Sequence, residues 1–476
     1  MKLRLWGPLC GFALLVSAHS IGCTENTIVR VNAANDGGLD DEGGREAGAG
    51  TCTPGASVDC TCPNGDMGKT ECDQSGSPGF CGCTSTNLNS HTVISKGGKS
   101  AIEVETHLAA APDGAMVSVW ISLGGSGSSD IGYVFSRDGG ATWTSPKAMG
   151  DSTGRESSDP VVASDPQGNF YATWISFTRS GGSQPSDFVL YVAKAAAGQN
   201  TFGTPVQVDT FDSGDKPWIT VTAAGTVLIT CMQQAAGNAV LNAHRSTNGG
   251  TGWTKSPIFT STGGAQANFI VPCAPKTGSR IWATHLSVEG SGLAQRLHWS
   301  DDDGVTWPAG NTKTYGIDSS ITPATCVAKG SDVWIGYGQW TSQPAGADAP
   351  VDEYHVIHTN NGTTITDVVA SDTKTKQQNL GSLALDDANG ELALTYYAGD
   401  SDGATGNVRS VRSGDGGKTW GVSKAVSADL QFTADRGSPK WLGDYMGTVL
   451  IKGSLYVTYG ENADGFTHVA FSKTVQ

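Results

Sequence analysis

A short motif of the form Ser-x-Asp/Asn-x-Gly-x-Thr/Gly-Trp recurs four times in the chain. The copies are Ser136–Trp143, Ser246–Trp253, Ser300–Trp307 and Ser413–Trp420. Their first residues are separated by 110, 54 and 113 positions, so each outer gap is twice the middle one and has room for one further copy. A fixed repeat of about 55 residues indicates a propeller, a solenoid or another array.

Two degenerate copies and a truncated one complete the series. Phe188–Lys194 resembles the segment Ile131–Ser136 that leads into the first motif, and Phe202 then stands where the Trp would be. His358–Ile365 keeps the Asn, Gly and Thr of the motif but ends in Ile. A last lead-in, His468–Ser472, lies four residues before the C-terminus. The sequence therefore predicts seven units, the last of them incomplete.

The residues of the motif suit a tight turn between two strands. Asp138, Asn248, Asp302 and Asp415 can each accept hydrogen bonds from backbone N–H groups of their own turn. The Gly two residues later can adopt a positive φ at little steric cost. The Trp then returns to a strand, where its ring can fill the gap between neighbouring sheets. We therefore interpret these four positions as structural turns and not as a site.

Each unit also has two strand-like segments upstream of its turn, which makes four strands per unit. That is the blade of a β-propeller. The closing unit supplies three strands, near residues 444–450, 454–459 and 467–472, and lacks an outer one. His91–Lys96 can supply it and close the ring, because a closed ring leaves no unpaired blade edge. The prediction is an all-β, seven-bladed propeller over residues 89–476, with six blades as the alternative count.

The motif resembles the bacterial neuraminidase repeat, or Asp-box, of the sialidase superfamily, and the resemblance covers roughly residues 90–476. It implies a propeller; known sialidases have six blades. Sialidases also have a Phe-Arg-Ile-Pro segment and three substrate-clamping Arg, and neither can be matched here. The nearest string, Arg280-Ile-Trp, lies in mid-chain. The resemblance thus supports the architecture and does not support sialidase activity.

The N-terminal residues read as an export signal followed by a tether. Residues 1–22 combine two basic residues with an apolar core over Leu9–Ala18. Ser20–Cys23 is similar to the lipobox of bacterial lipoproteins, in which Cys23 would carry the lipid. Residues 23–51 are rich in Gly, Asp and Ala and predict a flexible tether. We expect a lipoprotein of the cell envelope or outer membrane, held to the membrane only by that lipid, or an extracellular protein if the lipobox is not used.

The cysteines are unevenly distributed. Six of the eleven lie within residues 52–88, where an exported context and an even count predict a small disulfide-rich knot of undetermined pairing. The propeller segment contains three more. Cys273 and Cys326 occupy similar positions in consecutive innermost strands and are the expected disulfide, which leaves Cys231 buried and free.

The overall charge excludes one class of partner. The chain has 30 Lys and Arg against 45 Asp and Glu, a formal net charge of −15, and no basic run. Nucleic-acid binding requires a basic surface and is not expected. A glycan or a surface protein fits this composition better, and we expect a monomer.

Ligands of propellers bind at the mouth of the central channel, over the start of the innermost strands. Reading that position in each unit gives Glu105, Asp159, Asp215, Asn268, Thr322, Asn379 and Asp444. Four carboxylates in one ring would raise one another's pKa or require a cation between them. A bound cation at the channel mouth is therefore an open alternative, although no combination of residues predicts a dedicated metal site.

Further candidates surround this ring. Tyr445 joins the four carboxylates as a candidate catalytic group, and the expected ligand contacts are His107, Lys216, Trp218, Arg436 and Trp441. The alternative for any single Asp is a turn cap that satisfies local backbone N–H groups. Two functions remain open. One is a surface module that binds a glycan or protein; the other is a carbohydrate-active enzyme, a hydrolase or lyase using paired carboxylates or a Tyr/His couple.

Overall fold

The computed structural model describes residues 53, 56–61, 67–71, 90–95, 102–124, 129–149, 154–179, 184–289, 292–316, 323–339, 353–371, 377–399, 405–431, 441–462 and 465–474. Every regular element in them is a β-strand. The chain divides into two compact units. One holds residues 17–85 and contains the hairpin of β1 (Ser57–Thr61) and β2 (Met67–Glu71), and the other holds residues 86–476. No helix long and apolar enough to cross a membrane occurs in the described residues.

Residues 90–474 form seven four-stranded antiparallel sheets, one of which carries an extra short strand. Blade 1 contains β4 (Ile102–Ala110), β5 (Met116–Leu123), β6 (Ser129–Ser136) and β7 (Lys147–Ala148). Blade 2 contains β8 (Glu156–Ser164), β9 (Phe170–Thr178), β10 (Ser186–Ala195) and β11 (Val206–Phe211). Blade 3 contains β12 (Gly214–Val221), β13 (Val227–Ala235), β14 (Asn238–Ser246) and β15 (Thr254–Thr260).

The remaining blades repeat this order. Blade 4 contains β16 (Ala267–Cys273), β17 (Ile281–Glu289), β18 (Gly292–Ser300) and β19 (Thr312–Tyr315). Blade 5 contains β20 (Thr325–Lys329), β21 (Asp332–Gln339), β22 (Glu353–Thr359) and β23 (Thr366–Val369). Blade 6 contains β24 (Gln377–Leu385), β25 (Leu392–Gly399), β26 (Thr405–Ser413), β27 (Lys424–Ala425) and β28 (Leu430–Gln431). Blade 7 contains β29 (Gly447–Ile451), β30 (Ser454–Glu461), β31 (His468–Thr474) and β3 (Ser90–Val93).

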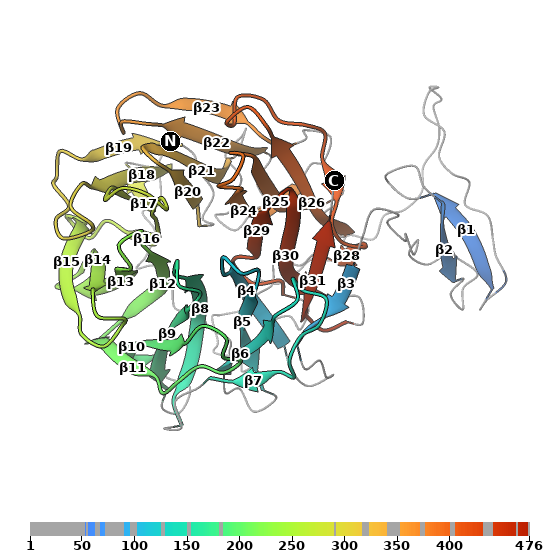
Figure 1. Ribbon diagram of the computed structural model, residues 1–476, viewed down its shortest axis with the longest axis horizontal. Helices are drawn as coiled ribbons and strands as arrows, with labels where there is room; N and C mark the ends of the chain where they lie inside the picture. The colour runs from blue at the N-terminus through green and yellow to red at the C-terminus, as the bar shows by residue number, and fades with distance from the viewer. Residues whose placement is uncertain are drawn as a thin grey trace, which may run out of the picture. The chain divides into compact units, whose positions relative to one another are not determined.

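The seventh blade is assembled from both ends of the propeller segment. Its outer strand β3 pairs with β31, with His91 opposite Ser472 and Val93 opposite Ala470. The innermost strand of each blade contacts that of the next, from β4 round to β29 and back to β4, and Figure 1 shows the blades arranged as a ring. Both the seven-blade count and the closure by the His91 segment are confirmed, and the six-blade alternative was wrong.

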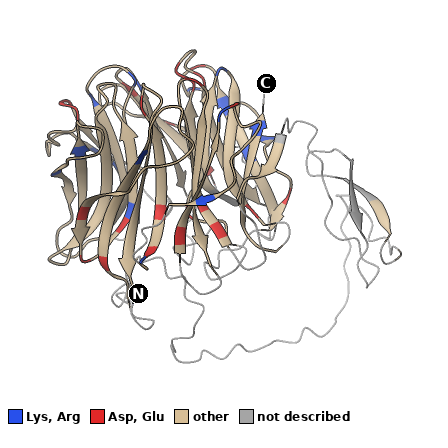
Figure 2. Ribbon diagram, turned by 60° about the horizontal axis from the view of Figure 1, so that its bottom comes forward, with Lys and Arg blue, Asp and Glu red and all other residues tan. Residues whose placement is uncertain are grey.

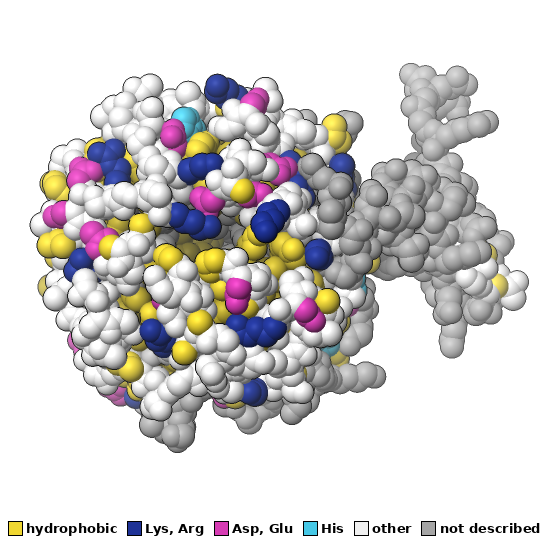
Figure 3. Space-filling model, viewed as in Figure 1, with side chains coloured by type: hydrophobic (Ala, Val, Ile, Leu, Met, Phe, Trp, Pro, Cys, Tyr) yellow, Lys and Arg dark blue, Asp and Glu magenta, His cyan; other side chains and the backbone are white. Residues whose placement is uncertain are grey.

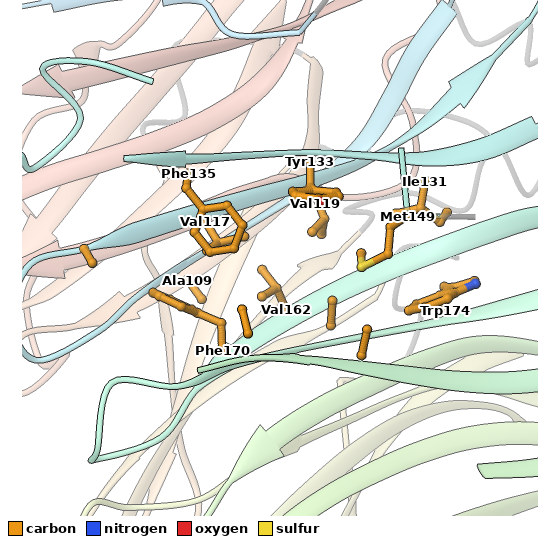
Figure 4. Close-up of a cluster of buried hydrophobic side chains, with 14 of the residues drawn as sticks. Ala109, Val117, Val119, Ile131, Tyr133, Phe135, Met149, Val162, Phe170 and Trp174 are labelled. Atoms are coloured by element: carbon orange, nitrogen blue, oxygen red, sulfur yellow. The ribbon is translucent and has the colours of Figure 1, made fainter. Parts of the chain in front are cut away.

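Large apolar side chains fill the space between adjacent blades. Between blades 1 and 2, Val117 and Phe135 pack with Phe170 and Trp174, all of them at most 1 % exposed, and Figure 4 shows these side chains facing one another. Burying each such side chain stabilises the fold by about 1.5–3 kcal/mol. The alternation of apolar residues along each strand thus holds the blades together.

The motif turns are as expected. In the first of them Asp138 Oδ1 accepts hydrogen bonds from Ser136 Oγ at 2.9 Å and from the N–H of Thr142 at 2.8 Å, while Ser136 Oγ accepts from the N–H of Gly140 at 2.8 Å. Asn248, Asp302 and Asp415 make corresponding bonds. The Trp of this motif, Trp143, packs on Phe471 of blade 7 with ring centroids 5.0 Å apart.

The degenerate copies keep parts of this arrangement. Asn361 Oδ1 accepts from the N–H of Thr364 at 3.0 Å, and Thr359 replaces the motif Ser by accepting from Gly362 N–H at 3.0 Å. In blade 2, Phe202 stands in for the Trp and packs on Phe135, with ring centroids 5.4 Å apart. The packing role of the aromatic ring is therefore retained even where the turn residues are lost.

The cysteine prediction for the propeller is confirmed. Cys273 and Cys326 form a disulfide between the first strands of blades 4 and 5, and Cys231 is buried and free. Cys23, the lipobox and most of the Cys-rich segment lie outside the described residues.

Antiparallel order divides the connections between two faces. Turns between first and second strands and the motif turns lie on one face, which we call the turn face; links between second and third strands and between blades lie on the opposite face, which we call the connection face. Figure 2 shows the blades side-on, with several Asp and Glu positions in the lower half of the strands as drawn. The innermost strands begin at the connection face, so residues near their N-terminal ends belong to that side.

Candidate functional site

Five innermost strands of the described ring contain a β-bulge at the same place. In β4 the pairing with β5 shifts between Val104 and His107, and β8, β12, β16 and β24 shift at matching positions. The first bulged residue in each case is a non-glycine with positive φ: Glu105 (53°), Asp159 (57°), Lys216 (49°), Phe269 (53°) and Leu380 (53°). This conformation costs about 1–3 kcal/mol per residue, and such strain is concentrated at functional sites.

In several blades the bulge residue lies one position after the residue that the sequence analysis assigned to the ring. Glu105 and Asp159 occupy the bulge position, but Asp215 and Asn268 lie one residue before it, where Lys216 and Phe269 take that place. The sequence analysis assumed regular strands, whereas a bulge inserts an extra residue and so shifts the positions that follow it. Thr322 lies outside the described residues.

Lys216 is the centre around which three of the predicted carboxylates meet. Its Nζ lies 3.0 Å from Glu105 Oε1, 2.6 Å from Asp159 Oδ1 and 2.9 Å from Asp444 Oδ2. Lys216 is 2 % exposed, and the three acids are 0 %, 1 % and 7 % exposed. Asp215, also buried, accepts a hydrogen bond from Nδ2 of Asn268 at 2.8 Å. Residues from blades 1, 2, 3 and 7 thus form one buried group, the carboxyl cluster: Glu105, Asp159, Asp215 and Asp444 around Lys216.

The acids in the cluster outnumber its single base. Burial raises the pKa of Glu105 well above its usual value, and the nearby charges of Asp159 and Asp444 add to this effect against the opposing influence of Lys216. Burial, assisted by Asp159, raises the pKa of Asp215 to about 7. Asp215 is therefore close to half-protonated at neutral pH, and Glu105 holds its proton to a higher pH than a solvated glutamate does.

Burial acts on the pKa of the lysine in the opposite direction from its effect on the acids. Burial alone would lower the pKa of Lys216, but the surrounding carboxylates, Asp159 first, outweigh it and raise that pKa well above its usual value. Lys216 is therefore an ammonium ion that neutralises part of the cluster. The sequence left open whether the carboxylates raise one another's pKa or hold a cation between them; in the structure the Lys216 side chain lies between three of them. No group of three or more His, Cys, Asp or Glu in the described part of the chain is placed to hold a metal ion.

Two carboxyl groups of the cluster interact directly. Oε2 of Glu105 and Oδ2 of Asp159 are both buried. A hydrogen bond between the two carboxyls contributes to the raised pKa of Glu105, so a proton on one carboxyl can be shared with the other.

Three aromatic side chains adjoin the carboxyl cluster. His107, Trp218 and Tyr445 pack edge to face, with ring centroids 5.5 Å apart for His107 and Trp218, and 5.2 Å for Trp218 and Tyr445. The Tyr445 hydroxyl donates to Pro160 O at 3.0 Å, and its ring lies 5.6 Å from Lys216 Nζ. We call His107, Trp218 and Tyr445 the aromatic cluster.

His107 is the accessible polar group of the aromatic cluster. Burial lowers its pKa to about 4, so the imidazole is neutral at pH 7. Its Nδ1 faces the N–H of Val162 at 3.5 Å, whereas Nε2 has no hydrogen bond to any described residue. The side chain is only half-buried. It can therefore donate to, or accept from, a bound molecule.

The remaining predicted residues have other surroundings. Trp441 is 4 % exposed and packs with Val104 and Ile121 in an apolar cluster. Its contact with a ligand stays a prediction. Arg436 lies outside the described residues.

Two members of the ring of bulges were missed by sequence reasoning. Phe269 and Leu380 give the ring an apolar side opposite the carboxyl cluster, and they are 3 % and 8 % exposed. A pair made of a polar residue and the bulge residue recurs in Asp215-Lys216, Asn268-Phe269 and Asn379-Leu380. That recurrence was available in the sequence, but only the polar members were selected.

Comparison with known proteins relates this chain to others through its fold. No protein-family model matches the chain, and no curated protein matches it either. A Dyadobacter fermentans protein of unknown function is similar over 82% of this chain and 99% of its own, with 14% identity and a TM-score of 0.51. A PL25 ulvan lyase is similar over 82% of this chain and 96% of its own, with 11% identity and a TM-score of 0.51.

The phage phi92 endosialidase is also similar, over 81% of this chain and 69% of its own, with 9% identity and a TM-score of 0.50. At such low identity these likenesses establish architecture and nothing about chemistry. The chain has the sialidase-like β-propeller fold, here with seven blades.

Proposed function

We propose that this protein is an exported β-propeller that binds a carbohydrate at its aromatic and carboxyl clusters. The observation that carries the proposal is the contact of His107 and Trp218 with Tyr445, directly beside the buried carboxyls. Sugars offer C–H faces to aromatic rings and hydroxyl groups to polar acceptors, and binding sites combine apolar walls with a few placed polar groups. The neutral imidazole of His107 supplies such a polar group.

A second candidate is a carbohydrate-active enzyme, a hydrolase or a lyase. The specific observation in its favour is the raised pKa of Glu105, which makes that carboxyl a stronger holder of its proton beside Asp159 and Tyr445. A protonated carboxyl paired with an ionised one is the usual arrangement for glycosidic bond cleavage. Binding without turnover requires no such pair, so the two candidates differ in a measurable way.

Export and anchoring complete the proposal and come from the N-terminal sequence. Residues 1–22 would direct export, and a lipid on Cys23 would retain the protein at the cell surface. A Cys23→Ser variant should then appear in the culture medium instead of the membrane fraction. Recovery of both proteins in the medium would contradict the anchor and leave the binding proposal intact.

A glycan array probed with the mature protein tests the binding proposal, with Trp218→Ala and Trp420→Ala as a matched pair. Trp218 belongs to the aromatic cluster, whereas Trp420 packs between blades next to a motif turn. We expect at least one glycan class to bind, the Trp218→Ala variant to lose about tenfold or more in affinity, and the Trp420→Ala variant to keep it. Binding that survives Trp218→Ala in a folded protein would refute the assigned location.

The same glycans should be assayed for new reducing ends and for unsaturated products. Turnover that disappears in a folded Glu105→Gln variant would establish the enzyme candidate. Bound glycans that remain uncleaved would eliminate it and leave a binding module.

A further inference from the structure

The position opposite each bulge, in the second strand of the blade, holds a buried side chain. These residues are at most 1 % exposed: Trp120 in β5, Trp174 in β9, Cys231 in β13, His285 in β17 and Tyr396 in β25. Among these five, His285 is the side chain whose usual pKa lies in the physiological range. Blade 4 therefore differs from the other bulged blades at a matched position.

His285 is stacked on a second imidazole. Its ring and that of His298 in β18 have centroids 5.0 Å apart and planes at 10°, and Nδ1 of His285 lies 3.2 Å from Nε2 of His298. The two residues, which we call the His pair, are 0 % and 5 % exposed, and Nε2 of His285 is buried without a hydrogen-bond partner. Because a hydrogen bond needs an acceptor, the contact requires at least one neutral ring.

The His pair lies at the interface between blades 3 and 4. Phe259 of β15 packs on both rings, with its centroid 4.7 Å from that of His285 and 6.0 Å from that of His298. The guanidinium group of Arg296 lies 5.2 Å from the centre of the same Phe259 ring. A proton added to either imidazole would therefore place a second positive charge near Arg296.

In the side chains that the structure describes, the strands around the His pair are basic or neutral. None of those on β13 to β20 is an Asp or a Glu. The other basic side chains of these strands are exposed or interact elsewhere: Lys313 is exposed, Lys329 donates to Asp387 O, His244 and Lys255 contact Asp209 of blade 2, and Arg245 contacts Asp303 of a motif turn. A protonated His pair would thus gain no compensating carboxylate from these strands.

The two imidazoles resist protonation in the folded protein. Burial lowers the pKa of His285 well below its usual value, and the charges of His298 and Arg296 lower it further. Burial and the charge of Arg296 lower the pKa of His298 to about 4. Below the usual value of 6.5 the unfolded chain therefore binds more protons at these residues than the folded chain, so the stability that they contribute falls as pH falls from 6.5 towards 4.

The bulge opposite His285 connects the His pair to the carboxyl cluster. Asn268 precedes this bulge, and its Nδ2 donates to Oδ2 of Asp215 at 2.8 Å. Within the bulge, the carbonyl of Ile270 accepts from Oγ1 of Thr230 at 2.7 Å. Both hydrogen bonds join blade 4 to blade 3, so a separation of the two blades at His285 would break them.

We propose that the His pair is an acid-sensitive contact that loosens the interface between blades 3 and 4 when it takes up protons. Loosening frees the bulge of blade 4 and withdraws Asn268 from Asp215, so that acid acts on the carboxyl cluster through blade 4. The inference is independent of the proposed carbohydrate binding. It follows from the stacked geometry of the pair, the unpartnered Nε2 of His285 and the lack of acids among the described side chains of the surrounding strands.

Amide hydrogen exchange of the unmodified protein at pH 7 and pH 5, corrected for the intrinsic rate at each pH, tests the proposal. Protection of β16 and β17 should fall about tenfold or more at pH 5. Protection of β24 and β25 in blade 6, where Tyr396 takes the place of His285, should change by less than about twofold. An equal change in the two blades, or no change in blade 4, would overturn the proposal.

Substitutions link the loss of protection to the two imidazoles. His285→Phe and His298→Phe should each reduce the acid-induced loss severalfold, and the double variant should abolish it, because each substitution removes one titrating group. His358→Gln in blade 5 is the matched control and should leave the loss unchanged. Two single variants are used because one of them could fail to fold, which thermal unfolding at pH 7 identifies. A loss of protection retained in full by both folded single variants would contradict the assignment to the His pair.

Discussion

Two sets of carboxyl groups in this propeller have opposite surroundings. The Asp of a motif turn is exposed and surrounded by donors of its own turn: hydrogen bonds from the Thr142 hydroxyl and N–H lower the pKa of Asp138 to about 2. Glu105 is fully buried, shares its surroundings with other acids and has a raised pKa. The same chemical group loses its proton more readily in the motif turn and holds it more tightly in the carboxyl cluster.

The backbone shows the same difference. The motif turn places Gly140 at a φ of 84°, where glycine is unstrained, while the central bulge places Glu105 at 53°. A Gly in the bulge would remove the strain together with the side chain. The ring therefore retains strained non-glycine residues where the turn face uses glycine, and the following experiments address this difference.

The largest expected effect follows from removing the central cation. Lys216→Met would remove the buried ammonium group that contacts Glu105, Asp159 and Asp444, which should lower the free energy of unfolding by about 3–5 kcal/mol. The matched control is Lys276→Met, whose partner is Asp387 but whose side chain is 75% exposed. That variant should lose at most about 1 kcal/mol. Equal losses in denaturant titration would contradict the distinction between centre and surface.

A second comparison places a methyl group at two turn-face glycines. At Gly140 (φ 84°) an added Cβ would collide with the ring of Phe471, whereas at Gly114 (φ 87°) nothing lies within 4 Å. Gly140→Ala should cost about 2–4 kcal/mol from overpacking and backbone strain together, and Gly114→Ala about 1 kcal/mol from strain alone. Similar unfolding midpoints for the two variants would show that the motif turn does not pack against blade 7.

A smaller effect depends on pH. Folding raises the pKa of Asp215 from 3.8 to about 7, so between these values the folded state binds more protons than the unfolded state, and stability falls as pH rises through this window. Asp215→Asn removes that loss while keeping an acceptor for Asn268. A shift of about three pKa units corresponds to at most about 4 kcal/mol, so the variant should be more stable than the parent by about 2–4 kcal/mol above pH 7 and should show no advantage below about pH 4.

Asp415→Asn is the control for that measurement and should behave oppositely. The Thr419 hydroxyl and N–H lower the pKa of Asp415, so its contribution to stability is present at neutral pH and is lost as pH falls through the lowered pKa. The Asn variant should therefore be the less stable protein at neutral pH. Stabilisation by both substitutions at neutral pH would mean that the two carboxyls do not differ in the way described.

Much of the fold could be predicted because it depends on local, repeated chemistry. The spacing of the motif was sufficient for seven blades, and the truncated last unit required the His91 segment as its partner. Cys273 and Cys326 lay at matching positions of consecutive strands, so their disulfide followed from the repeat. Each of these inferences needs only the period of the chain and the chemistry of a turn.

The central site was predicted less completely because it depends on long-range packing. The four acids were named from their positions, but the role of Lys216 as their counter-ion was not, since it depends on side chains from blades 1, 2 and 7. The bulges were also missed, because the alternation of apolar and polar residues does not reveal a positive φ at a residue such as Phe269.

The most direct test of the central site compares two imidazoles that each lie against a Trp. His107 adjoins Trp218 in the aromatic cluster, and His358 stacks on Trp334 at 5.0 Å in blade 5 while bonding to Asp332. Affinity for the glycan selected by the array should be measured by calorimetry for His107→Ala and His358→Ala. We predict a loss of about tenfold or more for the first variant and none for the second. Unchanged affinity in a folded His107→Ala protein, or an equal loss in both, would contradict a binding site at the centre of the ring.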